Sequence, residues 1–259
     1  YIIYNGNPIQ DISSININKP QFTSSREFFF SIGDFIERKN FHSLIEMMRI
    51  MPEFDLIISG NNNKSYGDHI KNLIDKYKLK NVILTGKISD NDKNFYLKNC
   101  EAFLFPSIRE GFGLPPIEAM AYGKPVFLSD KTSLPEIGGD AAYYWTNFDA
   151  EYMKIMLLTN LEAFKTEGYK AVEKIKKRAT FFDWKKAADE YLEKMKTSQE
   201  TTFDKLKQKQ KPSGAFGWFD GSDENEYITR HILAGLGHYL GVEALWLRLI
   251  MVVLIFGFG

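Results

Sequence analysis

The chain has 259 residues, of which 44% are hydrophobic and 25% are charged, proportions that are ordinary for a globular protein. Thirty-three basic residues balance 33 acidic ones, so the charge gives no reason to expect a nucleic-acid partner. The single cysteine, Cys100, excludes an internal disulfide, fits a reducing compartment and is expected in the core. The four histidines are scattered and show no metal-site spacing. The length allows one large domain, or one domain with an appendage.

Short apolar runs alternate with amphipathic stretches between residues 28 and 145. The apolar runs predict strands at 28–33, 55–59, 81–85, 102–105, 125–129 and, as a short last strand, 143–144. The stretches between them predict helices over about 40–51, 65–78, 90–99 and 115–122. Residues 149–198 are helical and charged in pattern. This alternation predicts an α/β fold, a Rossmann-like parallel sheet with helices on both faces.

Loops that carry chemistry follow three of the predicted strands, beginning at Gly33, Gly86 and Glu110. Ligands of parallel sheets bind outside the carboxyl ends of the strands. We therefore expect these three loops to converge on one edge of the sheet.

The most informative stretch is EGFGLPPIEAM, residues 110–120. It follows a buried strand that ends at Pro106, and its own Pro115 and Pro116 suit the first turn of a helix, where a missing N–H is tolerated. Strand, glycine-bearing loop and helix therefore follow one another. This order brings free backbone N–H groups and a helix N-terminus to one point, which is a ready site for an anion such as phosphate.

Two carboxylates stand eight positions apart in this stretch. We expect Glu110 on the loop and Glu118 on the first turn of the helix, both near the same cleft. Carboxylates accept hydrogen bonds from hydroxyls, so two of them beside a phosphate site indicate a sugar-bearing nucleotide. Taken singly, Glu110 is equally explained as a solvated loop residue, and Glu118 as an acid that favours the helix dipole.

The whole string resembles the E-x7-E signature of retaining glycosyltransferases of the group-1 class, which have the GT-B fold and form carbohydrate-active family four. The resemblance implies that Glu110 contacts the donor sugar and that Glu118 holds the ribose. It also implies that the amides of Phe112, Gly113 and Leu114 face the sugar hydroxyls and the phosphate.

Two cations, Arg38 and Lys39, precede the first predicted helix. Cations are unfavourable at a helix N-terminus unless an anion such as a diphosphate lies between. Alternatively, both are flexible surface residues. The segment SIGDFIERKN resembles the family's first glycine-and-basic loop, which implies that Gly33 belongs to the donor site and that Lys39 contacts the diphosphate. Many members carry Arg directly after the glycine, where this chain has Asp34, so Arg38 is a candidate substitute for that cation.

Two more segments resemble donor-site parts of the same family. Residues 82–90 resemble the strand and loop that flank the nucleobase, which implies that backbone groups near Lys87 and Ile88 read the base edge. By itself this segment indicates a strand, a turn and an Asp cap. Residues 130–140 resemble the loop that closes over the donor sugar and diphosphate, and by themselves indicate a Gly-rich surface loop.

The two ends of this likeness concern domain organisation. Residues 4–7 resemble the hinge between the two halves of these enzymes, and residues 182–184 resemble the final segment that crosses back. The chain thus corresponds to the C-terminal half of a GT-B fold, and we expect the N-terminal, acceptor-binding half to be missing. The predicted segments are a hinge (1–27), a nucleotide-sugar-binding Rossmann-like domain (28–198), a linker (199–224) and a helical C-terminal appendage (225–259).

The appendage has a different character from the rest. A basic run at 205–211 and a Gly-, Ser- and Asp-rich stretch predict the linker before it. The strings GLGHYLGV and LWLRL resemble the start of a PspC domain, a small stress-linked membrane module, apparently truncated here. The apolar residues 249–259 are fewer than the ~20 that span a bilayer. This apolar segment could pack on the domain, lie at a membrane surface or be a truncated span. We interpret His238 as a residue of the packing or of the membrane interface.

The resemblance implies the donor-binding half of a retaining glycosyltransferase, which transfers a hexose from a nucleotide diphosphate sugar to a glycan or lipid-linked acceptor. The catalytic candidates are Glu110 and Lys39. The donor-binding candidates are Gly33, Arg38, Lys39, Lys87, Ile88, Glu110, Phe112, Gly113, Leu114 and Glu118.

Further expectations concern the setting of this activity. The nucleotide sugar is a substrate, and we expect neither a cofactor nor a metal ion. The expected context is bacterial polysaccharide biosynthesis in the cytoplasm or at the periphery of the inner membrane, and the fragment alone is expected to have little or no activity. The alternative is a non-catalytic nucleotide-sugar-binding or membrane-associated interaction module. A sugar epimerase would share the fold, but not the E-x7-E loop together with Lys39.

Overall fold

A computed structural model describes residues 4–9, 12 and 17–197 of the chain. The chain divides into two compact units, residues 1–188 and 189–259, and the sheet belongs to the first. The predicted linker at 199–224 and the PspC-like segment at 225–259 lie outside the described residues. Among the described helices, none is long and apolar enough to cross a membrane.

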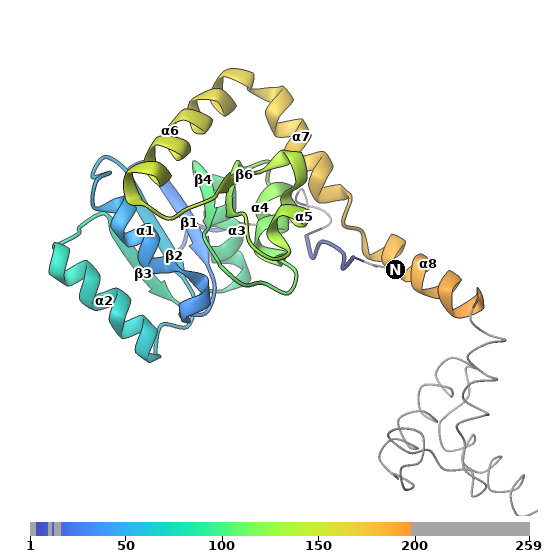
Figure 1. The fold of residues 1–259 in the computed structure, drawn as a ribbon, viewed down its shortest axis with the longest axis horizontal. Coiled ribbons are helices and arrows are strands. Elements are labelled where there is room, and N and C mark those ends of the chain that lie inside the picture. The colour runs from blue at the N-terminus through green and yellow to red at the C-terminus, as the bar shows by residue number, and fades with distance from the viewer. Residues whose placement is uncertain (1–3, 10–11, 13–16, 198–259) are drawn as a thin grey trace, which may run out of the picture. The chain divides into compact units, whose positions relative to one another are not determined.

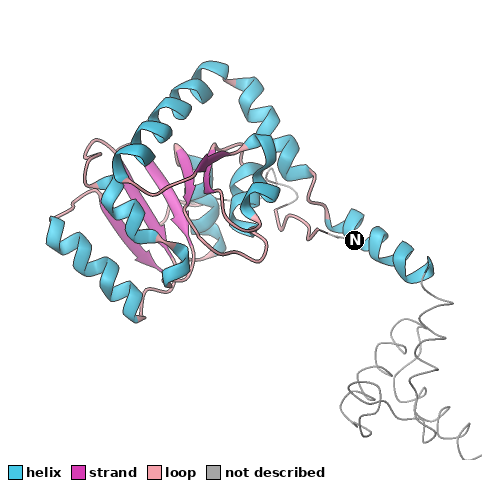
Figure 2. Ribbon diagram, viewed as in Figure 1, coloured by secondary structure: helices cyan, strands magenta, loops and turns pink. Residues whose placement is uncertain are grey.

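Six parallel strands form one sheet, as the alternating pattern predicts (Figures 1 and 2). Their order across the sheet is β3-β2-β1-β4-β5-β6, which is the order of dinucleotide-binding folds. The strands are β1 (Phe28–Ile32), β2 (Asp55–Ser59), β3 (Val82–Gly86), β4 (Ala102–Phe105), β5 (Val126–Ser129) and β6 (Tyr143–Trp145). The helices are α1 (Phe41–Met48), α2 (Ser65–Tyr77), α3 (Asp90–Asn99), α4 (Leu114–Ala121), α5 (Leu134–Gly138), α6 (Ala150–Glu167), α7 (Tyr169–Thr180) and α8 (Trp184–Thr197).

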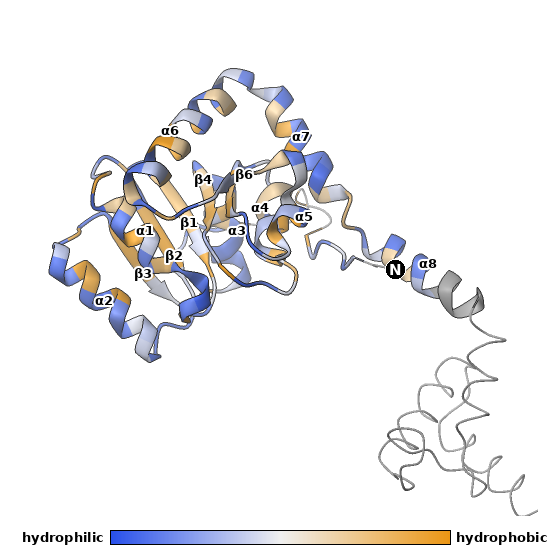
Figure 3. Ribbon diagram, in the orientation of Figure 1, coloured by the Kyte–Doolittle hydropathy of each residue, from blue (hydrophilic) through white to orange (hydrophobic). Residues whose placement is uncertain are grey.

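Successive strand side chains enter two separate hydrophobic cores, one on each face of the sheet. In β1, Phe29 packs into the core covered by α1, α2 and α6, whereas Phe28 and Phe30 pack into the core covered by α3, α4, α5 and α7. The hydropathy colouring in Figure 3 shows apolar residues concentrated in the strands between these helical layers. Cys100 is fully buried in the second core, where burial raises the pKa of its thiol to about 12. The expectation that Cys100 is a core residue is confirmed.

The predicted elements differ from the structure mainly at their ends. The first helix, predicted over about 40–51, runs from Phe41 to Met48 and so ends about three residues early. A 3-10 helix at Glu37–Lys39 and Asn40 in the left-handed conformation precede it. The segment at 130–140, interpreted as a surface loop, contains the short helix α5, which has a proline in its first turn. Five residues are too few to show a helical period in the sequence. The helical stretch at 149–198 consists of three helices, divided at Gly168 and near Asp183.

The two segments predicted at the hinge lie side by side. The N–H of Asn7 donates to the carbonyl of Phe182 at 2.8 Å. The Tyr4 ring meets the Phe182 ring edge-on, with centroids 5.8 Å apart. A Cβ added to Gly6 would lie 2.3 Å from Cγ of Trp184, so this contact requires glycine. The beginning of the chain is therefore joined to the turn between α7 and α8.

Candidate functional site

The carboxyl ends of β1 and β4 form the centre of the site. These strands are neighbours in the sheet, and the strand order reverses between them, which is where ligands bind in such folds. The loops that follow them are joined, because the N–H of Ile108 and the hydroxyl of Ser107 approach the carbonyl of Arg38 at 2.8 and 2.9 Å.

The predicted convergence of the strand-end loops extends to β2 and β3. The N–H of Gly33 donates to Ser59, and the N–H of Gly60 donates to Gly86, at 2.9 and 2.8 Å. A Cβ on Gly60 would lie 1.9 Å from the carbonyl oxygen of Gly33. Sequence reasoning missed Gly60, whose only signal is its place directly after a strand.

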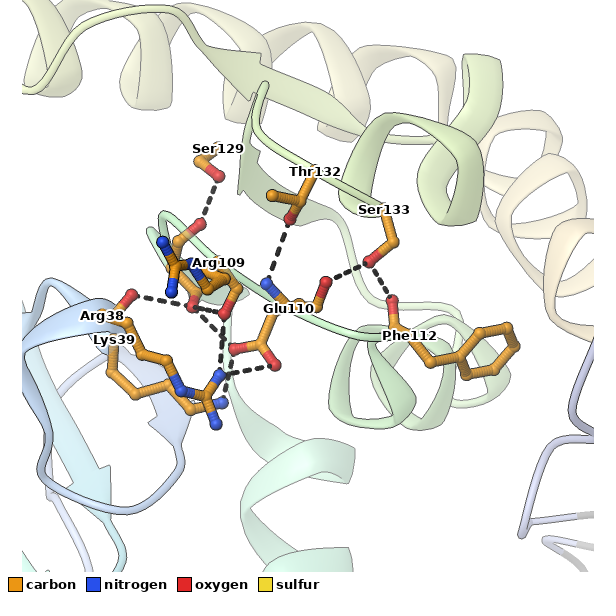
Figure 4. Close-up of polar contacts among 9 residues, drawn as sticks. Arg38, Lys39, Arg109, Glu110, Phe112, Ser129, Thr132 and Ser133 are labelled. Atoms are coloured by element: carbon orange, nitrogen blue, oxygen red, sulfur yellow. Dashed lines mark hydrogen bonds and ion pairs between the residues drawn. The ribbon is translucent and has the colours of Figure 1, made fainter. Parts of the chain in front are cut away.

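An ion pair between Lys39 and Glu110 lies at this centre (Figure 4). Nζ of Lys39 is 2.6 Å from Oε1 of Glu110, and both side chains are about nine-tenths buried. The ammonium also lies 4.6 Å from the ring centre of Phe105, and the Ser107 hydroxyl donates to the same Oε1 at 2.6 Å. The Lys39 stem runs over Gly33, where an added Cβ would lie 3.0 Å from Cε. The interpretations of Lys39 as a flexible surface residue and of Glu110 as a solvated loop residue are therefore wrong.

Arg38 reaches the same carboxylate from the surface. Its NH1 lies 3.2 Å from Oε2 of Glu110 and donates to the carbonyl of Arg109 at 2.7 Å. Its side chain remains 42% exposed, unlike that of Lys39. Two cations thus share one carboxylate, and the cluster keeps a net positive charge that can attract an anion.

The loop before α5 fixes the backbone of Glu110. Oγ1 of Thr132 accepts the N–H of Glu110 at 3.0 Å, while Oγ of Ser133 lies 2.7 Å from the carbonyl of Phe112 and 3.2 Å from that of Glu110 (Figure 4). Sequence reasoning did not single out these two residues. The only available signal was their place within the segment 130–140.

Thr132 adopts a positive φ of 51°, which is strained for a β-branched residue. We expect Thr132→Gly to change the free energy of unfolding by less than about 1 kcal/mol, because relief of strain offsets a lost hydrogen bond and added chain entropy. Binding of a nucleotide sugar should nevertheless weaken by about three- to tenfold, because Glu110 loses its backbone anchor. Chemical denaturation and calorimetric titration measure the two effects.

The matched variant is Thr132→Asn. Asparagine tolerates the left-handed conformation and has a side-chain oxygen that can accept the Glu110 N–H. It should therefore keep the affinity of the parent protein. Unchanged affinity in Thr132→Gly would show that Thr132 has no part in positioning Glu110.

Backbone N–H groups are available between β4 and α4. Among the described residues, none accepts a hydrogen bond from the amides of Gly111, Phe112, Gly113 or Leu114. Gly113 has a φ of 123° at the N-cap of α4, a conformation that side chains rarely adopt. The first turn of α4 contains two prolines, as predicted, and these lack N–H groups. The donors are thus concentrated in the loop that begins at Glu110.

Glu118 lies deeper in α4 than predicted. The helix begins at Leu114, so Glu118 is its fifth residue and falls in the second turn, not the first. It is also buried, and its Oε1 lies 2.8 Å from Nζ of Lys93, which in turn approaches Asp90 at 3.2 Å. The interpretation of Glu118 as an acid in the first turn that favours the helix dipole is therefore wrong.

Burial raises the pKa of the Glu118 carboxyl, and the hydrogen bond and charge of Lys93 offset part of that shift. Burial lowers the pKa of Lys93, but its contacts with Glu118 and Asp90 outweigh this effect and raise it. Lys93 therefore stays protonated beside a carboxylate that is costly to bury. Sequence reasoning missed Lys93, since no pattern within α3 marks it.

Lys87 and Ile88 follow β3, an edge strand that is separated from β4 by β2 and β1. Lys87 is exposed, while Ile88 is partly buried against the core. Within the described part of the chain, no hydrogen bond or ion pair joins either residue to Glu110. The predicted Asp cap is wrong, because the cap of α3 is Ser89, which forms a reciprocal capping box with Asp92.

The described residues contain no group of three or more His, Cys, Asp or Glu side chains placed to hold a metal ion.

Residues 13–151 match the family model described as glycosyl transferases group 1, and this match covers more than half of the chain. The chain belongs to this family.

Two curated relatives of this group-1 domain are named mannosyltransferases. The serotype-specific mannosyltransferase WbdA of Escherichia coli is 33% identical over 128 residues, which cover 47% of this chain and 16% of that protein. The O-antigen chain mannosyltransferase RfbU of Salmonella typhimurium is 30% identical over 151 residues, which cover 57% of this chain and 42% of that protein. The chain thus spans less than half the length of both relatives.

Solved structures share the fold of the group-1 domain. Sucrose-phosphate synthase from Thermosynechococcus elongatus superposes with a TM-score of 0.61 at 22% identity, over 70% of this chain and 47% of that one. Anabaena HepE, solved in complex with UDP-glucose, superposes with a TM-score of 0.60 at 18% identity, over 67% and 49%. The predicted fold class, a Rossmann-like half of a GT-B fold, is confirmed.

Proposed function

We propose that this group-1 domain is the donor-binding half of a retaining glycosyltransferase. It would transfer a hexose from a nucleotide diphosphate sugar to a glycan or lipid-linked acceptor. The observation that carries the proposal is the cluster of Lys39, Arg38 and Glu110 at the switch point of the sheet, beside a loop of unpartnered amides.

The diphosphate would bind between the cations and the loop amides. A lysine ammonium has three N–H donors, so Lys39 can contact a phosphate oxygen while it holds Glu110. Arg38 is more exposed and can approach the diphosphate from the solvent side. The amides of Phe112, Gly113 and Leu114 would complete the anion site without adding mobile charge.

The remaining donor groups would lie around that diphosphate. Glu110 would accept hydrogen bonds from sugar hydroxyls through Oε2, which receives only the longer 3.2 Å contact of Arg38, since Oε1 already receives both Lys39 and Ser107. Glu118 would hold the ribose, and in support of this role it lies in the helix that directly follows the proposed phosphate loop. Backbone groups near Lys87 and Ile88 would contact the base, as the resemblance implies.

During transfer, the bond between the anomeric carbon and the diphosphate would break, the acceptor hydroxyl oxygen would form a bond to that carbon on the same face of the sugar, and the hydroxyl proton would pass to the leaving diphosphate. Negative charge then accumulates on the leaving diphosphate. Lys39 and the loop amides are already fixed by buried contacts, so they could stabilise this charge with little rearrangement. We propose that no metal ion is needed, because these cations and amides supply the required charge.

The names of the relatives support a narrower proposal for the substrate. WbdA and RfbU are named mannosyltransferases, the latter of the O-antigen chain, so we propose mannose as the hexose and a bacterial polysaccharide as the product. HepE was solved with UDP-glucose, which supports a nucleotide sugar as the donor class. We further propose that turnover requires an acceptor-binding half, so that this chain alone binds donor but transfers little.

The test is a thermal-shift screen of UDP-, GDP- and ADP-sugars with the full chain, followed by calorimetric titration of the best one. Glu110→Gln should reduce the preference for the nucleotide sugar over the free nucleoside diphosphate, because a neutral amide oxygen accepts hydrogen bonds from sugar hydroxyls more weakly than a carboxylate does. Glu173→Gln, on the exposed surface of α7, is the matched control. Absence of binding by every nucleotide sugar, or an unaltered preference in Glu110→Gln, would overturn the proposal in favour of an interaction module.

A further inference from the structure

A pocket adjoins the proposed donor site on the side of α1 and α2. Its volume is about 580 Å³, within the roughly 300–1,000 Å³ range of small-molecule sites. None of its lining residues is a donor-site candidate. They are Glu37, His42, Ser65, Tyr66, His69 and Ile108.

The pocket lies at the same sheet edge as the donor site. α1 and α2 begin after the carboxyl ends of β1 and β2, so His42 and Ser65 stand at that edge. Glu37 directly precedes Arg38 in the 3-10 helix, and the backbone N–H of Ile108 donates to the carbonyl of Arg38. One short backbone bridge therefore separates the pocket from the Lys39–Glu110 cluster.

A buried tyrosine fixes the floor of the pocket. The hydroxyl of Tyr66 accepts the backbone N–H of His42 at 3.1 Å and lies 2.9 Å from its Nδ1. The hydroxyl keeps its own proton and a second lone pair, so it can bond Nδ1 in either tautomer of His42. Within the described part of the chain, no residue bonds Nε2, so this ring nitrogen is free to bond a ligand hydroxyl as a donor or as an acceptor.

The lining favours a neutral ligand with many hydroxyls. Burial and the neighbouring His69 lower the pKa of His42, so its ring is neutral near pH 7. The carboxylate of Glu37 opposes an anion, although two helices begin here. The rings of Tyr66 and His69, with centroids 6.0 Å apart, and the exposed Ile108 offer apolar surface beside the polar groups. Sugars present such alternating apolar faces and hydroxyls.

We propose that this pocket binds a saccharide unit of the acceptor glycan, so that this half contributes an acceptor subsite beside the donor site. The assignment to the acceptor rests on the proposed function. Glu37 and Ser65 would bond hydroxyls, His42 would bond a hydroxyl through Nε2, and the ring faces of His69 and Tyr66 would pack on the sugar.

The test uses the full chain, methyl α-mannoside as the probe, and NMR signals of the histidine rings. The sequence has four histidines, so His42 and His69 can be assigned with His42→Gln and His69→Gln, and the other two serve as references. We expect saturable shifts of the His42 and His69 signals alone. In His69→Ala, followed through His42, the dissociation constant should rise about fivefold, as for loss of one ring contact. Tyr169→Ala, an exposed ring on α7, should bind as the parent does.

Several outcomes would overturn the proposal. These are the absence of shifts up to about 50 mM saccharide, far above a millimolar dissociation constant, and equal affinity in His69→Ala. Shifts caused by inorganic phosphate but not by the saccharide would show an anion site instead. A nucleotide sugar titrated into the same sample separates the two hypotheses. Its failure to bind, with the histidine shifts intact, contradicts the donor site and leaves the saccharide site standing.

Discussion

Replacement of Lys39 by methionine is expected to weaken binding of a nucleoside diphosphate on the order of 100-fold. The lost interaction is a charge-assisted one in a position shielded from water, worth about 3 kcal/mol. Lys39 has only 9% of its side chain exposed, so neither water nor salt should replace its charge effectively. Methionine keeps an unbranched apolar stem over Gly33 and beside Phe105, so the packing should survive. Calorimetric titration with UDP, GDP and ADP measures the effect.

The same substitution should lower the free energy of unfolding by only about 1–2 kcal/mol. Removal of one member of a buried ion pair typically costs about 3–5 kcal/mol, because the other charge is left unpaired. Here Glu110 keeps Arg38 and the hydroxyl of Ser107 as partners. Lys98→Met, at an exposed position in the last turn of α3, is the matched control and should change neither quantity. If Lys39→Met bound the diphosphate as the parent does, the assignment of the anion site to this cluster would be wrong.

The fold class could be predicted from the sequence because its physical cause is local. A strand buried on both faces is almost continuously apolar, as in residues 102–105 and 126–128, and helices between such strands impose a parallel sheet. The loop of Glu110 is also a local feature, since its glycines and prolines determine the backbone between β4 and α4. The order of the strands across the sheet could not be predicted in this way, because each pairing depends on packing across the whole domain.

The contacts that build the site could not be predicted for the same reason. Lys39 and Glu110 are 71 positions apart, and neither residue's neighbours reveal the other. Thr132 and Ser133 reach the Glu110 loop only because β5 lies beside β4 and delivers the next segment to the same edge. The one-residue error in the start of α4 moved Glu118 from the predicted first turn into the second, where it is buried.

Lys93→Met is expected to lower the free energy of unfolding by about 2–3 kcal/mol near pH 7, because it leaves the buried carboxylate of Glu118 without a cation. Burial already raises the pKa of Glu118, and loss of Lys93 should raise it further. A carboxyl whose folded pKa lies above its unfolded pKa stabilises the fold at low pH, and this contribution is lost as the pH rises through the folded pKa. The defect of Lys93→Met should therefore shrink on acidification toward the ordinary carboxyl range. Urea denaturation at a series of pH values measures it.

The double variant Glu118→Gln with Lys93→Met removes both charges and should recover to within about 1 kcal/mol of the parent. Donor binding then separates two roles of Glu118 that stability alone cannot distinguish. If Glu118 holds the ribose, Glu118→Gln and the double variant should both lose nucleotide-sugar affinity, whereas Lys93→Met should keep most of it at pH 7. If Glu118 only supports the packing of α3 on α4, the double variant, whose stability recovers, should also bind the donor with the affinity of the parent. Full donor affinity in the double variant would therefore show that Glu118 does not contact the ligand and that its role is to pair with Lys93 in the core.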